Sequence, residues 1–176
     1  MAIFKAITSV NGKPTGHSSP EKLEKELKFK YNEQHKEVLR TDMVSALNAD
    51  KDDFAESCED IAAHFNTCHK GSLQYKHYIQ CFPSEDCNII TQEKCHEIGV
   101  EFAQHFWSQF PVLIVTHHEN GRYDNHFVVY NCNVNNGRKI DTSHAQMWEQ
   151  KRFVASQIER YGLTLEGLVF ENTAQT

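Results

Sequence analysis

The hydrophobic positions of this chain fall into short runs that alternate between the period of a strand and the period of a helix. Strand-like runs cover residues 2–10, 73–82, 111–116 and 126–132. Helical spacing predicts helices over residues 21–33, 52–68, 91–107 and 143–161. The run PVLIVT at residues 111–116 is almost wholly apolar, which is typical of a strand covered on both faces.

Capping residues mark several helix ends. Ser19 and Pro20 precede the first helix, and Thr91 precedes the third. Ser143, followed three residues later by a glutamine, has the spacing of a capping box, and Gly162 stands where the last helix should end.

The first helix has one narrow apolar stripe. At about 100° per residue, Leu23, Leu27 and Tyr31 share a face, so Tyr31 is expected to pack at the edge of the core. Phe29 falls away from this stripe among lysines and glutamates and is expected to face outward.

The order of elements indicates one domain. The polar segment 33–48 is assigned as a loop with at most a short strand near Leu39 or Val44, and residues 168–170 as a short last strand. The predicted order is strand, two helices, strand, helix, two strands and helix. This order indicates an α/β (α+β) fold with a largely antiparallel sheet and helices on its faces. A length of 176 residues is typical of a single domain.

Composition narrows the class of protein. Mean hydropathy is -0.61 and 39% of residues are hydrophobic, as in ordinary globular domains. No apolar run approaches the length of a membrane span, and the N-terminus lacks the features of a secretory signal, so we expect no membrane and a cytoplasmic protein. The six cysteines are then expected to be free thiols. The net charge of -6 argues against indiscriminate binding of nucleic acid, so any DNA contact should be local.

A possible metal site lies around the two strands nearest the hairpin segment HENGRYDN. His117 leaves one strand, and Asp124 and His126 enter the next. Residues two apart on a strand share a face, so Asp124 and His126 should project together with His117 beside them. Such a set suits Mn, Zn, Fe or, less naturally, Mg. The alternative is a polar loop that happens to contain two histidines and an acid.

Four motifs in order resemble the relaxases, the mobilisation nucleases of conjugative plasmids and integrative elements. They are GHSSPEKLEKELKFKYN, QYKHYIQCF, QEKCHEIGVEFAQHF and THHENGRYDNHFVVYNCNVNNGRKIDTS. The resemblance covers most of the chain and implies a single catalytic domain over residues 1–176, with further C-terminal regions in a longer protein. It also implies the fold of the HUH endonucleases, a five-stranded antiparallel sheet flanked by helices.

The resemblance also implies an activity. In relaxases a tyrosine attacks one phosphodiester of single-stranded DNA at an origin of transfer, forms a 5'-phosphotyrosyl link and initiates conjugation, assisted by a divalent metal ion. Expected partners are single-stranded and hairpin DNA, relaxosome accessory proteins and a type IV secretion coupling protein, with a monomeric bacterial enzyme as the default.

The sequence departs from the family pattern in two places, and the first concerns the metal ligands. Asp124 stands where many relatives have histidine, which should shift the metal preference toward Mn or Mg. Glu119 matches the family acid and is expected either to orient a histidine or a water, or to be a solvated loop carboxylate.

The second departure concerns the nucleophile. Alignment of KLEKELKFKYN places Phe29, which has no hydroxyl, at the nucleophile position. Either the chain is an engineered Tyr-to-Phe variant, or Tyr31 is the nucleophile, or the protein is a natural relative that does not cut.

Other residues are candidates for DNA contacts. His77 occupies a strand position that holds histidine in many relatives, and Arg122, Arg138 and Lys139 are candidate phosphate contacts. Packing in the strand explains His77 equally well, and for Arg122, Arg138 and Lys139 a solvated surface charge is the more frequent explanation. The alternatives to a relaxase are a DNA-binding module of the same fold that does not cut, and a rolling-circle replication initiator, whose tyrosine usually follows the metal motif.

Overall fold

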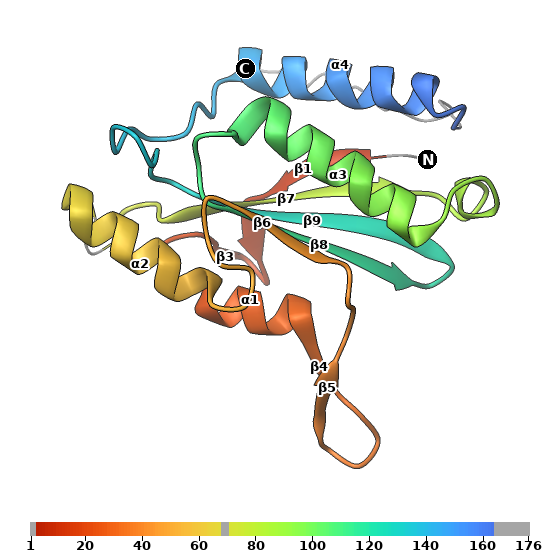
Figure 1. Cartoon of the computed structure of the whole chain (residues 1–176), viewed down its shortest axis with the longest axis horizontal. Coiled ribbons are helices and arrows are strands. Elements are labelled where there is room, and N and C mark those ends of the chain that lie inside the picture. Colours follow the sequence, from red (N-terminus) through yellow and green to blue (C-terminus); the bar gives the residue numbers. More distant parts are fainter. Residues whose placement is uncertain (1–2, 68–70, 164–176) are drawn as a thin grey trace.

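The computed structural model describes residues 3–67 and 71–163, in which a five-stranded antiparallel sheet lies between two layers of helices (Figure 1). The strand order is β1-β7-β9-β8-β6. The strands are β1 (Ile3–Ile7), β6 (Val44–Leu47), β7 (Tyr75–Phe82), β8 (Val112–Glu119) and β9 (Arg122–Tyr130). Helices α3 (Gln92–Trp107) and α4 (His144–Arg160) cover one face, and α1 (Glu21–Lys28) and α2 (Phe54–Phe65) cover the other. The expected fold class is confirmed.

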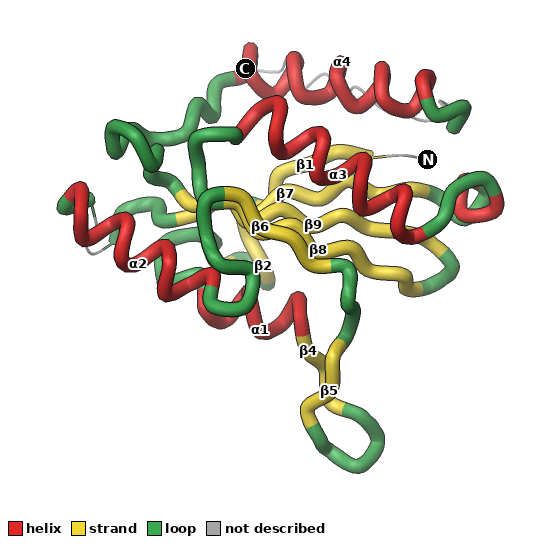
Figure 2. Tube along the Cα trace, in the orientation of Figure 1, coloured by secondary structure: helices red, strands yellow, loops and turns green. Residues whose placement is uncertain are grey.

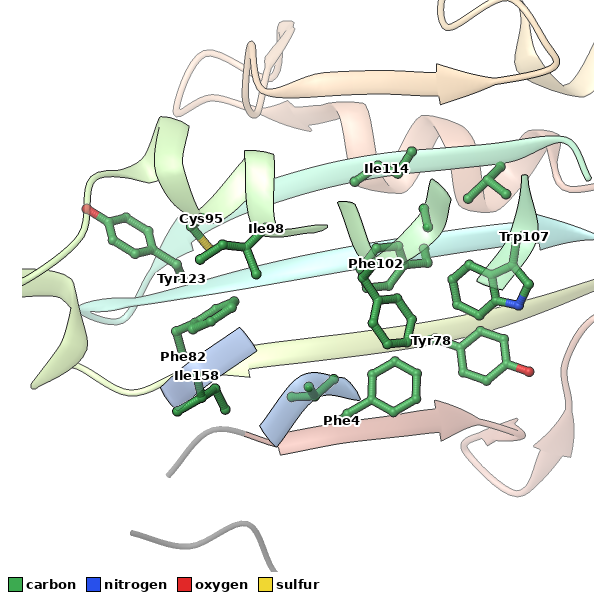
Figure 3. Packing of buried hydrophobic residues seen from close by; sticks show 14 of the residues in the cluster. Phe4, Tyr78, Phe82, Cys95, Ile98, Phe102, Trp107, Ile114, Tyr123 and Ile158 are labelled. Atoms are coloured by element: carbon green, nitrogen blue, oxygen red, sulfur yellow. The ribbon is translucent and has the colours of Figure 1, made fainter. Parts of the chain in front are cut away.

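Packing differs between the two faces of the sheet. On the side of α3 and α4, a cluster rich in aromatic residues joins both helices to the sheet, and its members include Phe4, Tyr78, Phe82, Phe102 and Trp107 (Figure 3). On the side of α1 and α2 the core is smaller and is built around Leu27, Phe54, Cys58, Leu113 and Val128. Residues 112–115 of β8 are fully buried, so the strand expected to be covered on both faces is confirmed.

Most of the predicted caps are present. The Thr91 hydroxyl accepts a hydrogen bond from the amide of Lys94, and Ser143 does the same for Gln146. The segment 33–48 contains both short strands, β5 (Glu37–Leu39) and β6. A 3₁₀ helix, η1 (Asp86–Asn88), precedes α3. The strand expected at residues 168–170 lies outside the described residues.

The N-terminal strand prediction was partly wrong. Residues 2–10 were expected to form one buried strand, but β1 is an edge strand that stops at Ile7. Residues Ser9–Val10 form β2, which pairs with β3 (Lys13–Pro14) in a small separate hairpin, and Val10 is exposed. The glycine and proline of this segment favour the tight turn over a continued strand.

Helix α1 ends five residues earlier than its pattern predicts. Phe29 is already extended, and Phe29–Tyr31 forms β4, which pairs with β5 in a hairpin that projects from the sheet (Figure 2). The Asn32 side chain accepts hydrogen bonds from the amides of Gln34 and Lys36, which stabilises the hairpin turn. Aromatic residues favour a strand in this setting, so local hairpin pairing outweighs helical spacing.

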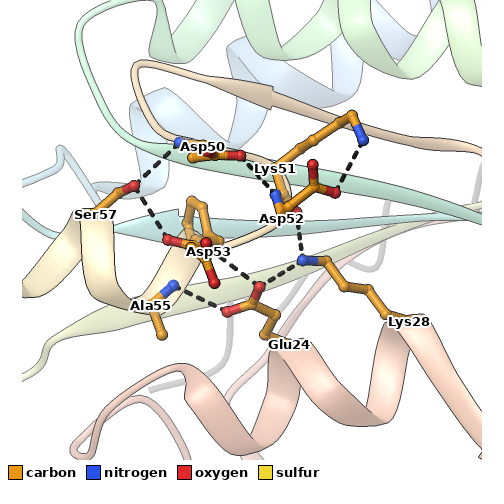
Figure 4. A network of polar contacts seen from close by, with 9 residues as sticks. Glu24, Lys28, Asp50, Lys51, Asp52, Asp53, Ala55 and Ser57 are labelled. Carbon is orange, nitrogen blue, oxygen red and sulfur yellow. Dashed lines mark hydrogen bonds and ion pairs between the residues drawn. The ribbon is translucent and has the colours of Figure 1, made fainter.

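A buried ion pair fixes α1 against α2 (Figure 4). Glu24 and Lys28 are both buried, and the Lys28 ammonium donates to the Glu24 carboxylate and to the carbonyl of Lys51. The same carboxylate accepts from the amides of Phe54 at 3.2 Å and Ala55 at 2.9 Å. These are otherwise unsatisfied N–H groups of the first turn of α2, so Glu24 caps a helix other than its own.

Among the described residues, Cys58, Cys81, Cys87, Cys95 and Cys132 are free thiols, as expected. No helix in the described ranges is long and apolar enough to cross a membrane.

Replacing Glu24 should destabilise the fold more than replacing Lys28. In Glu24→Gln the buried Lys28 loses its counter-charge, which should lower the free energy of unfolding by about 3–5 kcal/mol. In Lys28→Met the carboxylate keeps its two amide donors, and the loss should be smaller, about 1–3 kcal/mol. Urea unfolding at pH 7 measures both, with exposed Lys25→Met as a control that should change little. An equal or larger loss in Lys28→Met would contradict this account.

Candidate active site

The hairpin between β8 and β9 is tighter than its polar sequence suggests. We expected a polar connection through HENGRYDN, but the ladder continues until Glu119 pairs with Arg122. Only Asn120 and Gly121 form the turn, and both have positive φ angles, 53° and 73°. Asn-Gly is the preferred sequence of such two-residue turns. The polar residues of this segment are therefore fixed within the sheet.

Strand register gathers three histidines on the face covered by α1. His117 lies opposite Asp124, and His126 lies opposite Val115 on β8 and Ile79 on β7. His77 on β7 shares this face because it is two residues from Ile79. The Nε2 atom of His77 is 3.1 Å from Nδ1 of His126, and the ring centroids of His117 and His126 are 4.6 Å apart. We call His77, His117 and His126 the histidine cluster.

Helix α1 covers the histidine cluster. The carbonyl oxygen of Leu27 is 2.7 Å from Nε2 of His117, a side chain that is only 2% exposed. Since a carbonyl only accepts, this contact places the ring proton of His117 on Nε2. The end of α1 is thus attached to the site.

Burial lowers the pKa of all three imidazoles, which favours their neutral form. It lowers the pKa of His117, and it lowers the pKa of His77 to about 4, with a smaller contribution from the charge of His117. Burial, followed by the charges of His117 and His77, lowers the pKa of His126 to about 2. Neutral imidazole is the form that binds metal ions.

Asp124 lies beside the cluster with one oxygen engaged. Its Oδ2 accepts from Nε of Arg122 at 3.2 Å, while its buried Oδ1 has no hydrogen-bond partner. Three imidazoles and an unsatisfied carboxylate oxygen are suitable donors for a divalent transition ion. Within residues 3–67 and 71–163, however, no three such side chains already surround a common point.

Glu119 is held by an arginine that sequence analysis missed. Arg40 donates from Nε to Oε1 at 2.6 Å and from Nη2 to Oε2 at 2.7 Å, and this hydrogen bonding lowers the pKa of Glu119. Arg40 also donates to the carbonyl of Glu26 in α1. Glu119 is therefore not a free solvated carboxylate. Nothing in the local sequence of Arg40 indicates this pairing across 79 positions.

Phe29 and Tyr31 lie on the projecting hairpin next to α1. Both line a cavity of about 730 Å³ together with Arg40 and residues of α1. Tyr31 is 71% exposed, so its expected place at the edge of the core was wrong, because the strand that replaces the last helical turn carries it away from the sheet. His77 lines a separate cavity of about 200 Å³, and Lys22 and Glu26 of α1 line both cavities.

The basic residues that are candidates for phosphate contacts lie in different parts of the structure. Arg122 is part of β9 at the site and pairs with Asp124. Arg138 and Lys139 are exposed in the loop after β9, beyond the end of the strand opposite to the hairpin turn. The neighbouring Gly137 packs against Phe65 at the end of α2. The structure therefore does not bring these two residues to the histidine cluster.

A second polar network fixes the strands from the other face of the sheet. The buried Asn125 side chain accepts from the Thr116 hydroxyl at 2.6 Å and donates to the carbonyl of Cys95 at 2.8 Å. It also donates to Gln80 of β7, so the network spans β7, β8, β9 and α3. A Cβ atom at Gly99 would lie 2.7 Å from this amide, which explains the glycine in α3. These contacts hold the backbone on which His117 and His126 stand.

The fold resembles a solved structure described as "Molecular Basis of Vancomycin Resistance Transfer in Staphylococcus aureus". The alignment has a TM-score of 0.57 and 16% sequence identity, and it covers 94% of this chain and 96% of that one. At this identity the likeness concerns the fold.

Sequence comparison identifies relatives and a family. Two curated proteins described as "Protein rlx" from Staphylococcus aureus are each 27% identical to this chain, over 127 and 108 residues. These matches cover 72% and 61% of this chain and 38% and 32% of the relatives, so the chain spans about a third of their length. The family model "Relaxase: MobA/VirD2-like, nuclease domain" matches residues 31–163, and the chain therefore belongs to the MobA/VirD2-like relaxase nuclease-domain family.

Proposed function

We propose that this domain recognises single-stranded and hairpin DNA at an origin of transfer, and that its fold is built to cut one phosphodiester there to start conjugative transfer. The observation that carries the proposal is the buried histidine cluster joined to the end of α1, two residues before position 29. A relaxase reaction needs both a metal-binding face and a nucleophile attached close to it. The expected accessory proteins, coupling protein, cytoplasmic location and monomeric state remain predictions.

The proposed reaction is a transesterification. With a tyrosine at position 29, as in Phe29→Tyr, the phenol would lose its proton and its oxygen would bond to phosphorus, while the bond from phosphorus to the 3' oxygen breaks and that oxygen takes up a proton to leave as a hydroxyl. Relaxase nucleases generally use a divalent metal ion, which when bound neutralises charge on the phosphate. His117, Asp124 and His126 are the donors that would hold it. The expected choice of Mn or Mg depends on Asp124 being one of them.

The protein residues position the reacting groups. Arg40 holds the Glu119 carboxylate and the end of α1 together, so the start of the hairpin at Phe29 has a defined place. With Phe29 the chain lacks the hydroxyl, and DNA binding without cutting is the second candidate function. Tyr31 is the alternative nucleophile, and its exposure leaves its hydroxyl accessible.

Introducing a tyrosine at position 29 should create cleavage activity. Labelled single-stranded oligonucleotides from transfer origins, incubated with Mn, should form a covalent adduct with Phe29→Tyr and none with the parent chain. Adduct formation should disappear in Phe29→Tyr combined with His126→Ala. Cleavage by the parent that is lost in Tyr31→Phe would move the nucleophile to Tyr31. No adduct from either protein would favour the binding module.

Arg40 should act on the cleavage rate by positioning. In the Phe29→Tyr background, Arg40→Met should lower the single-turnover rate by about 10- to 100-fold, because small misplacements of a reacting group are costly. Arg40→Lys keeps the charge but not the paired hydrogen bonds, and it should restore little of the rate. Full rescue by lysine would show that charge alone matters.

DNA binding should depend on salt through a few phosphate contacts. For single strands each contact contributes about -0.7 to the slope of log K against log salt. Arg122→Ala should make the slope shallower by about that amount. Arg152→Ala on α4, across the sheet from the site, should leave it unchanged. The same measurement on Arg138→Ala and Lys139→Ala tests whether DNA extends to the far end of β9. A salt-independent affinity of the parent would contradict binding through phosphates.

A further inference from the structure

We propose that the cavity between α1 and the projecting hairpin of β4 and β5 holds one unpaired DNA base, and that Glu37 selects guanine there. The inference rests on the proposed function, since the base belongs to the single-stranded DNA that this domain would recognise. It assigns a ligand to the cavity of about 730 Å³ that Phe29, Tyr31 and Glu37 line together with residues of α1. This volume is within the range of roughly 300–1,000 Å³ that small-molecule sites occupy.

The register of the hairpin places an aromatic ring beside a carboxylate. Tyr31 on β4 lies opposite Glu37 on β5, and opposite residues of an antiparallel pair point to the same face. Phe29 is two residues from Tyr31 and shares this face, whereas Lys30 and Val38 point to the other one. Because Phe29, Tyr31 and Glu37 all line the cavity, the face that carries the rings and the carboxylate is the one turned toward it.

Tyr31 presents an open aromatic surface to a ligand. Its side chain is 71% exposed, so it buries little apolar area and contributes little to folding. Unpaired bases stack on such rings, and this stacking tolerates any base because every base has a π-face. The ring therefore explains affinity for an unpaired base but not a choice among bases.

The charges of the cavity do not favour a phosphate. Among the described residues that line it, the acids Glu21, Glu26 and Glu37 balance the cations Lys22, Lys25 and Arg40. Each of these cations also has a carboxylate within 4 Å: Glu26 for Lys22, Glu21 for Lys25 and Glu119 for Arg40. A ligand without negative charge, such as the base of a nucleotide, suits these surroundings better than its phosphate does.

Glu37 is a carboxylate of this cavity whose oxygens can accept hydrogen bonds from a ligand. Within the described part of the chain, its side chain has neither an ion pair nor a hydrogen bond. Hydrogen bonding to Glu21, followed by the charges of Glu21 and Glu37, raises the pKa of Lys25, so the Glu37 carboxylate lies near α1. It is therefore on the cavity side of the hairpin and available to a bound base.

Guanine is the base that fits such a carboxylate. Its Watson–Crick edge has two adjacent donors, N1–H and the N2 amino group, which match the two carboxylate oxygens as the fork of an arginine does. Adenine and cytosine place a ring-nitrogen acceptor beside their amino group, and thymine places a carbonyl on each side of its N–H group. Each of these three bases would therefore bring an acceptor lone pair toward the carboxylate.

The cavity is next to the place where cleavage would occur. Phe29 lines it, and so does Arg40, which holds the end of α1 through the carbonyl of Glu26. The selected guanine would thus adjoin the phosphodiester that a tyrosine at position 29 would attack.

The test is binding of labelled single strands to the whole chain, followed by fluorescence anisotropy with a chelator present so that no cleavage occurs. The strands are thymidine runs with one central guanine, hypoxanthine, adenine or cytosine, or with thymine throughout. The parent should bind the guanine strand about 10-fold more tightly than the all-thymine strand, as expected for a bidentate contact. Hypoxanthine lacks the N2 amino group and should recover only part of this difference.

Variants of the hairpin separate selection from stacking. Glu37→Gln should reduce the preference for guanine to about twofold or less, because the amide offers only one acceptor oxygen. Glu33→Gln is the matched control, since it removes the same charge from the turn of this hairpin and should keep the preference. Tyr31→Ala should weaken binding of all five strands by about 10-fold, and Tyr31→Phe should change it little.

Three results overturn the inference. They are equal binding of the guanine and all-thymine strands by the parent, an unchanged preference in Glu37→Gln, and a loss of preference in Glu33→Gln as large as that in Glu37→Gln. Unchanged affinity in Tyr31→Ala overturns the stacking. Glu33, Tyr31 and Glu37 are exposed, so the variants should fold, and circular dichroism checks this.

The proposed function fails separately. If guanine is preferred through Glu37 but Phe29→Tyr forms no adduct, the base pocket stands and cleavage does not. If Phe29→Tyr forms an adduct while the parent shows no preference for guanine, cleavage stands and the base pocket does not. Absence of binding to every strand overturns both.

Discussion

The C-terminal end of helix α1 is the contact on which the site depends. A helix leaves its last carbonyl groups without intrahelical partners, and at a buried end other groups must supply the donors. In α1 every donor comes from the hairpin or the site: Phe29 N for Lys25, Arg40 Nη1 for Glu26, His117 Nε2 for Leu27 and Arg40 N for Lys28. The helix end, the hairpin and the edge of the sheet therefore form one unit.

This arrangement couples the position of the helix to the chemistry of the site. The ion pair of Glu24 with Lys28 fixes the buried side of α1 on α2, and the carbonyl of Leu27 fixes its end on His117. An ion that binds through Nε2 of His117 must displace that carbonyl. An ion that binds through Nδ1 would leave the contact in place, because a ligating histidine can donate its other ring N–H to a carbonyl, and residue 29 would then be held two positions from that contact.

Local sequence signals predicted much of this structure. The apolar run of β8, the Thr91 cap and the Ser143 cap depend on neighbours within a few residues, and all three are confirmed. The end of α1 was wrong because the pairing of Phe29 with Leu39 competes with helical spacing. The Asn-Gly turn had a local signal, but the polar residues around it suggested a longer loop.

Long-range register explains what sequence alone could not provide. The expectation that His117, Asp124 and His126 share one face is met, since two of them are on one strand and the third is its hairpin partner. His77 lies on β7, 49 positions before His126, and the contact between the two depends on the exact register of β7 and β9. Arg40 reaches Glu119 in the same non-local way.

Charge at this edge of the sheet gives the ion a second role. The net charge of the chain is -6, and DNA phosphate adds further negative charge. Arg40 is paired through two hydrogen bonds with Glu119, whereas Arg122 is half-exposed and contacts Asp124 through Nε. The neutral imidazoles of His117 and His126 add no charge of their own, so they would not reduce the positive charge of a bound ion. The attraction of this face for a phosphate should therefore come from the ion together with exposed cations such as Arg122, and the imidazoles serve to hold the ion in place.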